Sequence, residues 1–205
     1  MIPALLRLPS SSLGPDALDA LAALVVARSP GQLVLLGPQR TTTGEKLDEF
    51  TLAAALVARD ERVRLGVATS VGAGRAPSLV AREATTTQLL GACELLLLEG
   101  EPSACRDAAA IIEALFAPGA HTVTTRTASI TGAVNDPVPS VDGGPPVLWR
   151  DGAALHRLVA GAETRVGDAL DVPLPGALPA PAPGTLVVAV HEVVPVEQLA
   201  SAFGP

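Results

Sequence analysis

Apolar residues in the first half of the chain follow a strand-then-helix pattern that repeats. Short apolar runs predict strands beginning near positions 4, 33, 63 and 94, each followed by apolar positions at helical spacing. The stretch from Arg62 to Glu101 shows the unit most fully: a strand, a loop, a helix that begins at Pro77 and stops at Gly91, and a second strand. Two parallel strands joined by a helix form a right-handed crossover, so the pattern predicts an α/β fold.

The other helices of this half follow the same spacing. One helix is expected to open at Pro15 and stop before Pro30, and another to run from 102 to 116 with Pro102 in its first turn. A further helix is expected near residues 46–59, after the second strand. It is expected to bury one stripe of side chains, formed by Leu47, Phe50, Ala54 and Val57.

The pattern changes after residue 120. The β-branched stretch from His121 to Thr131 predicts a hairpin or an extended excursion. The elements expected after it are a loop rich in proline and glycine (137–146), a fifth core strand (147–149), a helix (153–160), a last strand (186–191) and a closing helix (196–203). This gives six core strands.

Length and composition restrict the class of protein. The 205 residues are interpreted as one domain, 1–205, with an insertion region at 120–146 and a proline-rich loop at 170–184. The net charge is −7 and no basic tract is present, which argues against nucleic acid as a partner. No apolar run reaches the roughly 18 residues of a membrane span, and no signal peptide is recognisable, so we expect a cytoplasmic protein without a membrane partner.

The residues that most often hold metals or react with substrates are few. Cys93 and Cys105 have neither metal-site spacing nor the pattern of a disulfide framework, so we expect neutral core thiols and no metal site. His121 and His156 are expected on the surface, whereas His191 lies at the end of a predicted strand.

Chemistry in parallel βα units concentrates where strands end, here at 68–74 and 99–101. Glu99 and Glu101 are two residues apart and form either an acid/base pair or ordinary solvent-facing carboxylates.

Several motifs resemble the luciferase-like flavin monooxygenase family, which includes bacterial luciferase and deazaflavin-dependent reductases. The family's third strand reads arginine-isoleucine-arginine-leucine-glycine-threonine-alanine-valine, and Arg62 to Thr69 occupy the matching positions. The family's helix after this strand is matched by Pro77, Leu79, Ala81, Arg82 and Glu83, and its glycine-proline approach to strand five by residues 142–147. The resemblance covers about residues 1 to 160.

The resemblance implies a truncated or incomplete TIM-type βα barrel with helices outside its parallel strands. It implies FMN or a deazaflavin, with the ring supported at Ala68, Thr69 and Ser70 above a non-proline cis peptide at Ala68–Thr69. It places the flavin phosphate at Arg150, Asp151 and Gly152, before a helix N-terminus. It also implies a homodimer or a heterodimer with a family member, formed through helices of the second and third units.

The chain departs from the family pattern near the mouth of the expected barrel, the opening formed by the carboxyl ends of its strands. Where the family often has Asp-His or Glu-His, this chain has Pro38 and Gln39. Leu97 and Leu98 are bulky at a strand end that is usually glycine-rich, so we expect them to fill space that flavin needs. The other residues expected to line the mouth are Arg40, Glu99 and His191, with Gln39 and His191 as the catalytic candidates.

Two functions follow. One is a luciferase-like flavin-dependent oxidoreductase or monooxygenase acting with FMN or a deazaflavin on a small substrate. The other is a non-catalytic degenerate family member, either a partner subunit or a flavin-binding or structural protein, with or without a cofactor. The altered residues at the mouth favour the second, and the retained strand-three and strand-five motifs favour the first.

Overall fold

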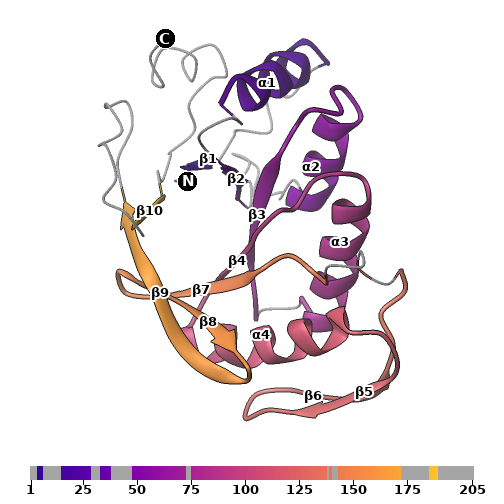
Figure 1. Ribbon diagram of the computed structural model, residues 1–205, viewed down its shortest axis with the longest axis vertical. Helices are drawn as coiled ribbons and strands as arrows, with labels where there is room; N and C mark the ends of the chain where they lie inside the picture. Colours follow the sequence, from indigo (N-terminus) through magenta and orange to yellow (C-terminus); the bar gives the residue numbers. More distant parts are fainter. Residues whose placement is uncertain are drawn as a thin grey trace.

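The computed structural model describes residues 4–6, 15–28, 33–37, 48–72, 75–137, 139, 143–171 and 185–188. These residues form an α/β fold (Figure 1). The helices are α1 (Pro15–Arg28), α2 (Glu49–Val57), α3 (Pro77–Leu89) and α4 (Pro102–Phe116). The main-sheet strands are β1 (Ala4–Leu6), β2 (Val34–Leu36), β3 (Leu65–Ser70), β4 (Leu96–Glu99), β7 (Val147–Asp151), β8 (Ala154–Val159), β9 (Ala162–Asp171) and β10 (Thr185–Val188).

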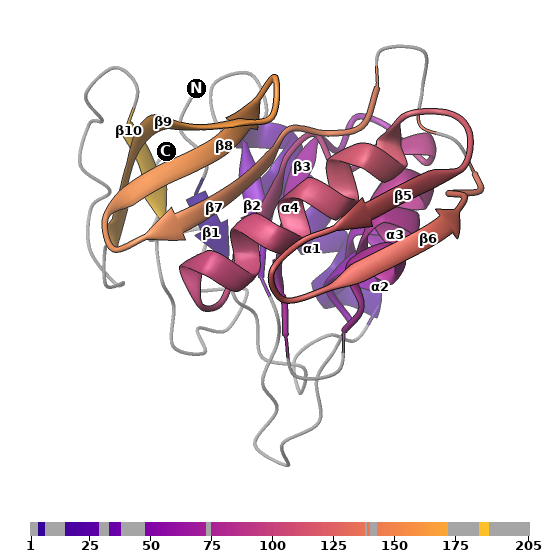
Figure 2. The same ribbon diagram turned by 90° about the horizontal axis from the view of Figure 1, so that it is seen from below.

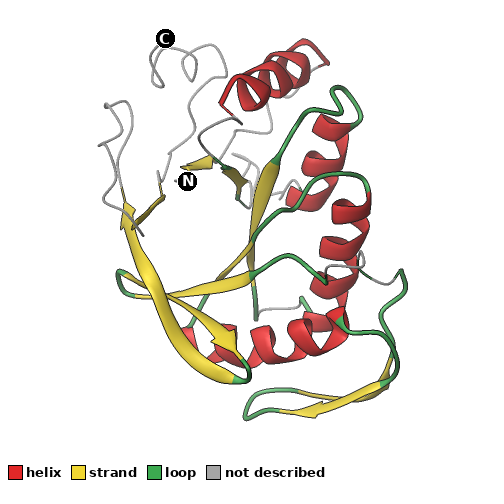
Figure 3. Ribbon diagram, in the orientation of Figure 1, coloured by secondary structure: helices red, strands yellow, loops and turns green. Residues whose placement is uncertain are grey.

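The main sheet has the strand order β1-β2-β3-β4-β7-β8-β9-β10. Strands β1 to β4 and β7 are parallel, β8 is antiparallel to both neighbours, and β9 and β10 pair in parallel. The sheet curves so far that its two end strands, β1 and β10, contact each other (Figure 1). The four helices lie on the outer side of this curve (Figure 3).

Side chains on the two faces of the sheet enter separate hydrophobic clusters. On the outer face, alternate residues such as Leu36, Val67 and Leu98 pack against the helices. On the inner face, the intervening residues form what we call the interior layer: Leu35, Ala68, Leu97, Leu148, Leu155 and Ala169. All six are buried, which agrees with strands that are covered on both faces.

The first half of the fold confirms the repeat. Each predicted strand from 4 to 99 is present, and the helix after β3 begins at Pro77 as expected. Its cap, Leu90, is followed by Gly91 at φ 101°, the left-handed conformation that lets a helix end there. Helix α4 runs over the expected range, with Pro102 in its first turn, and buries Ala108, Ile111, Ile112 and Leu115 along one side.

The predicted stripe of the second helix is wrong in part. Phe50 is buried, but Ala54 and Val57 are only half-buried, and the other predicted member, Leu47, lies outside the described residues. The buried side is instead formed by Glu49, Phe50, Leu52, Ala53 and Leu56. The buried face is therefore rotated relative to the expected one, with Leu52, Ala53 and Leu56 in place of Ala54 and Val57.

The predicted helix at 153–160 is also wrong. This segment is strand β8, and residues 147–171 form an antiparallel meander. Gly152 at φ 58° turns β7 into β8, and Ala160 and Gly161, at φ 52° and 78°, turn β8 into β9. Two successive residues with positive φ form the turn that suits a tight hairpin. The main sheet of the described residues therefore has eight strands instead of six.

The stretch after residue 120 forms a hairpin, as predicted. Strands β5 (His121–Thr124) and β6 (Ser129–Ala133) pair with each other outside the main sheet (Figure 2). Buried Asp107 of α4 accepts hydrogen bonds from the Thr127 N–H and hydroxyl, each at 2.8 Å, and so attaches the hairpin to α4. The proline-rich loop predicted at 170–184 is wrong at its start, because residues 170 and 171 belong to β9. Residues 172–184 and the predicted closing helix lie outside the described residues.

Candidate functional site

The carboxyl ends of the parallel strands meet at one edge of the sheet and bring several predicted residues together. Ser70 at the end of β3 is in register with Glu99 at the end of β4. On β7, Trp149 is in register with Leu98 of β4. Arg150, the next residue of β7, therefore lies level with Glu99. Ser70, Glu99 and Arg150 thus lie one step beyond the interior layer, where a polar rim would surround a ligand.

The two leucines of β4 have different positions from those expected. Leu98 faces outward into the cluster beneath the helices, whereas Leu97 belongs to the interior layer. Side chains normally fill the inside of such a curved sheet in layers. Leu97 therefore packs below the edge, and Glu99 is the next residue of β4 on the same face.

Ala68 and Thr69 point to opposite faces of β3. Ala68 is part of the interior layer, and Thr69 is buried on the helix side. Among the described residues the one cis peptide bond is Asp136–Pro137, so the expected cis bond at Ala68–Thr69 is wrong. A trans bond is the ordinary state, because a non-proline cis bond costs about 3–4 kcal/mol.

Residues 150–152 lie at the turn from β7 into β8. Asp151 pairs with Ala154 across the hairpin, and the Arg150 Nη2 group donates to the Gly152 carbonyl at 3.4 Å. The helix N-terminus expected here as the phosphate site is replaced by strand β8. The Asp151 side chain is exposed at this turn. Contact of these three residues with flavin stays a prediction.

A charged cluster that sequence reasoning missed lies beside this edge, around Arg75. Its Nη1 group donates to Glu49 Oε1 at 2.6 Å and to Thr69 Oγ1 at 3.2 Å. Its Nη2 group donates to Asp48 Oδ2 at 2.7 Å and to Glu83 Oε2 at 2.5 Å. We call Asp48, Glu49, Thr69, Arg75 and Glu83 the Arg75 cluster.

The Arg75 cluster ties three elements together. Arg75 comes from the loop after β3, two carboxylates come from the start of α2, and Glu83 comes from α3. The guanidinium carbon also lies 5.2 Å from the centre of the Phe50 ring, a cation–π contact. The Glu49 side chain is only 4% exposed, so this carboxylate depends on Arg75 for its compensation.

Burial and charge act against each other in the Arg75 cluster. Burial raises the pKa of Glu83 above its ordinary value, and Arg75 offsets this only in part. Burial also raises the pKa of Asp48, but hydrogen bonds from Thr51 and the charge of Arg75 outweigh it, so the net pKa is lowered. Burial lowers the pKa of Arg75, yet the carboxylates, Glu49 first, raise it to a net value above the ordinary one.

The remaining predicted residues have varied outcomes. Gln39, Arg40 and His191 lie outside the described residues. Glu101 does not pair with Glu99, because its carboxylate caps α4 by accepting from the Ala104 N–H at 2.9 Å.

Both cysteines are buried, and burial raises the pKa of each thiol to about 12, as expected for neutral core thiols. The predicted surface position of His156 is wrong, since its side chain is 16% exposed and stacks on Trp149 with ring centres 5.9 Å apart.

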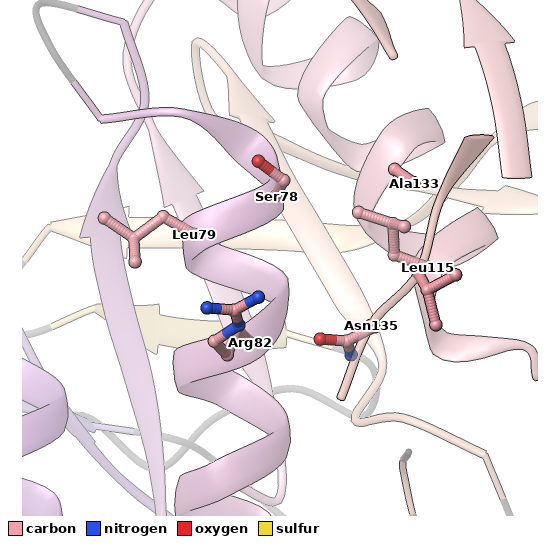
Figure 4. Close-up of a pocket in the computed structure, with 7 residues that line it drawn as sticks. Ser78, Leu79, Arg82, Leu115, Ala133 and Asn135 are labelled. Carbon is pink, nitrogen blue, oxygen red and sulfur yellow. The ribbon is translucent and has the colours of Figure 1, made fainter. Parts of the chain in front are cut away.

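Three cavities lie away from the carboxyl edge. The smallest, about 180 Å³, lies between α3 and β6, with Ser78, Leu79 and Arg82 on one side and Leu115, Ala133 and Asn135 on the other (Figure 4). A second, about 450 Å³, lies beside α1 and the turn after α2. The third and largest lies between α4 and β8. None of these three is lined by Ser70, Glu99 or Arg150.

Within the part of the chain that the structure describes, no three His, Cys, Asp or Glu side chains are grouped so that they could hold a metal ion. None of the helices formed by the described residues has both the length and the apolar character needed to cross a bilayer. Comparison of the sequence with models of protein families gives no match, and comparison with curated proteins gives none either.

Proposed function

We propose that this protein is a shortened, non-catalytic relative of the luciferase-like flavin oxidoreductases that serves as a partner subunit. The fold proposed with it is an incomplete βα barrel. Five parallel strands with helices outside them, a packed interior layer and contact between the end strands β1 and β10 support that architecture.

The observation that carries the proposal is the path of the chain after β7. A phosphate group binds well at a helix N-terminus, because free N–H groups and the helix dipole face it. Here Gly152 turns the chain directly into β8, and the carboxylate of Asp151 lies exposed at the turn. Negative charge at this place repels a phosphate.

A second candidate is the flavin-dependent enzyme itself, acting with FMN or a deazaflavin on a small substrate. It is favoured by one arrangement: Ser70, Glu99 and Arg150 come from three neighbouring strands and share one edge of the sheet. Arg150 is the cation of this row, and it is the residue on which phosphate binding would depend.

The subunit role also requires a surface for association. Exposed leucines lie along α3 and just beyond it: Leu79 is 45% exposed, and Leu89 and Leu90 are each 53% exposed. Leu79 lies in the first turn of α3, and Leu89 and Leu90 lie at its other end, so both ends of this helix offer apolar side chains that another protein could cover.

Titration of the full chain with FMN and with a deazaflavin, followed by flavin fluorescence, tests the proposal. We expect no saturable change with either flavin, and sedimentation of the protein alone as a dimer. Saturable binding that is lost in Arg150→Gln but kept in the exposed control Arg165→Gln would establish the second candidate instead. A monomer in sedimentation would contradict the subunit role.

A further inference from the structure

The largest of the three cavities, about 880 Å³, lies at the opposite edge of the sheet from Ser70 and Glu99. Its walls are the last turn of α4, residues 143–146 and the end of β8. Because Val147 begins β7, the preceding prolines mark the amino-terminal edge of the parallel strands. The volume is within the range of about 300–1,000 Å³ common for small-molecule sites.

Two charged side chains line this cavity without hydrogen-bond partners of their own. The Nε atom of Arg157 is buried and has no hydrogen-bond partner. Glu113 is half-buried, and burial raises the pKa of its carboxyl group, an effect that the charge of Arg157 offsets only in part. Among the described residues, neither side chain forms an ion pair. A buried polar atom that has lost its water without gaining a partner is costly, as Arg157 Nε is, and burial disfavours the charged form of Glu113. A ligand that pairs with both groups would relieve both penalties.

The end of α4 adds negative potential beside Glu113. The C-terminal end of a helix carries a partial negative charge, which basic residues usually compensate. The last turn of α4 has no basic residue. Glu113 therefore lies beside the negative end of a helix with Arg157 as a partial compensation, and a ligand ammonium would add the positive charge that the last turn of α4 lacks.

The apolar walls of the cavity are held in place. Gly144 lies so close to Phe116 that an added Cβ would be 2.0 Å from the ring atom Cδ2. The amide of Gln88 donates to the Gly143 carbonyl at 3.3 Å and fixes the same loop to α3. With Pro145 buried and Leu158 half-buried, this side offers a preformed apolar surface.

We propose that the cavity binds a zwitterionic α-amino acid with an apolar side chain. Arg157 receives the carboxylate, Glu113 and the end of α4 receive the ammonium, and the side chain lies against Phe116 and the prolines. A molecule with both charges satisfies both protein groups, whereas a molecule with one charge leaves the other group unpaired. This site is independent of any flavin.

Calorimetric titration of the full chain with L-leucine tests the proposal. L-leucine is expected to bind saturably, and N-acetyl-L-leucine and L-leucinamide, which each lack one charge, at least about tenfold more weakly. Equal binding of N-acetyl-L-leucine would show a site for simple anions and overturn the zwitterion assignment. Absence of leucine binding would overturn the site altogether.

Variants locate the site. Arg157→Gln and Glu113→Gln should each weaken leucine binding at least about tenfold, while Arg165→Gln on the adjacent strand β9, 61% exposed, should leave it unchanged. Wild-type affinity in either of the first two variants would contradict the proposal. If Arg157→Gln fails to fold, Glu113→Gln and the ligand series still decide, because they need only a folded chain.

Discussion

Replacement of Arg75 by methionine is expected to lower the free energy of unfolding by about 3 kcal/mol. Removing one partner of a buried ion pair leaves the other charge without compensation, which costs about 3–5 kcal/mol. Here Glu49 would remain buried beside Asp48 and Glu83. We expect a loss at the lower end of this energy range because the Arg75 side chain is still 21% exposed. Urea unfolding followed by the fluorescence of Trp149, the single tryptophan, measures the change.

Two comparisons separate charge from packing. Arg62→Met removes an arginine whose pair with Asp60 is solvent-exposed, and it should change stability little. Glu49→Gln combined with Arg75→Met should recover part of the loss, because the buried charge is then gone. Additive losses in the double variant would contradict a dependence of Glu49 on Arg75.

The loss in Arg75→Met should also depend on pH. Burial already raises the pKa of Glu83, and loss of the Arg75 cation, which now offsets part of that effect, should raise this pKa further. Groups with a raised folded pKa bind more protons in the folded chain than in the unfolded chain, so their protonation stabilises the fold. The deficit should therefore shrink as the pH falls from about 7 to about 5. A deficit that grows over this range would contradict the account.

Replacement of Gly66 by alanine is the second large effect, expected at about 3 kcal/mol of destabilisation. An added Cβ would lie 2.3 Å from Leu35 Cδ2 and 2.9 Å from the Leu95 carbonyl oxygen. Overpacking of a core costs about 1–3 kcal/mol, and a backbone oxygen cannot move aside as a side-chain end does. The midpoint of urea unfolding should fall accordingly.

Controls for Gly66→Ala come from the same region. Ser70→Ala, at the exposed end of the same strand, should change stability by less than about 0.5 kcal/mol. Adding Leu35→Ala to Gly66→Ala should cost less than the sum of the single changes, because the side-chain contact is relieved. An unchanged midpoint in Gly66→Ala would show that β2, β3 and β4 are not packed as closely as described.

The α/β part of the fold was predictable because its signals are local. Pro77 and Pro102 mark helix starts, Gly91 marks a helix end, and the apolar runs at 65–70 and 96–99 are strands buried on both faces. These features follow from backbone geometry and residue spacing, which a sequence displays directly.

The meander after β7 was missed although turn signals were present. Leu155 and Leu158 are three residues apart, a spacing that is compatible with a helix as well as with a strand. Asp151-Gly152 and Ala160-Gly161 are nine positions apart and match two tight hairpin turns. Interpretation of these two glycine-containing dipeptides as hairpin turns would have predicted strand β8 between them.

The Arg75 cluster could not have been found in this way. Its ion pairs to the start of α2 join residues 26 and 27 positions apart, and no spacing in the sequence links Arg75 to Asp48 or Glu49. The rim formed by Ser70 and Glu99, by contrast, was anticipated, because parallel strands place their carboxyl ends along one edge.

The central claim is that the chain turns directly from β7 into an antiparallel strand, at the place where the resemblance to luciferase-like flavoproteins implies a phosphate-binding helix. NMR chemical shifts of the full chain test it most directly. We predict strand-type Cα shifts through 154–159 and cross-strand NOEs that link Arg150 with Leu155 and Trp149 with His156. Helical Cα shifts in this segment, with NOEs between residues three apart, would contradict the claim and restore the phosphate site.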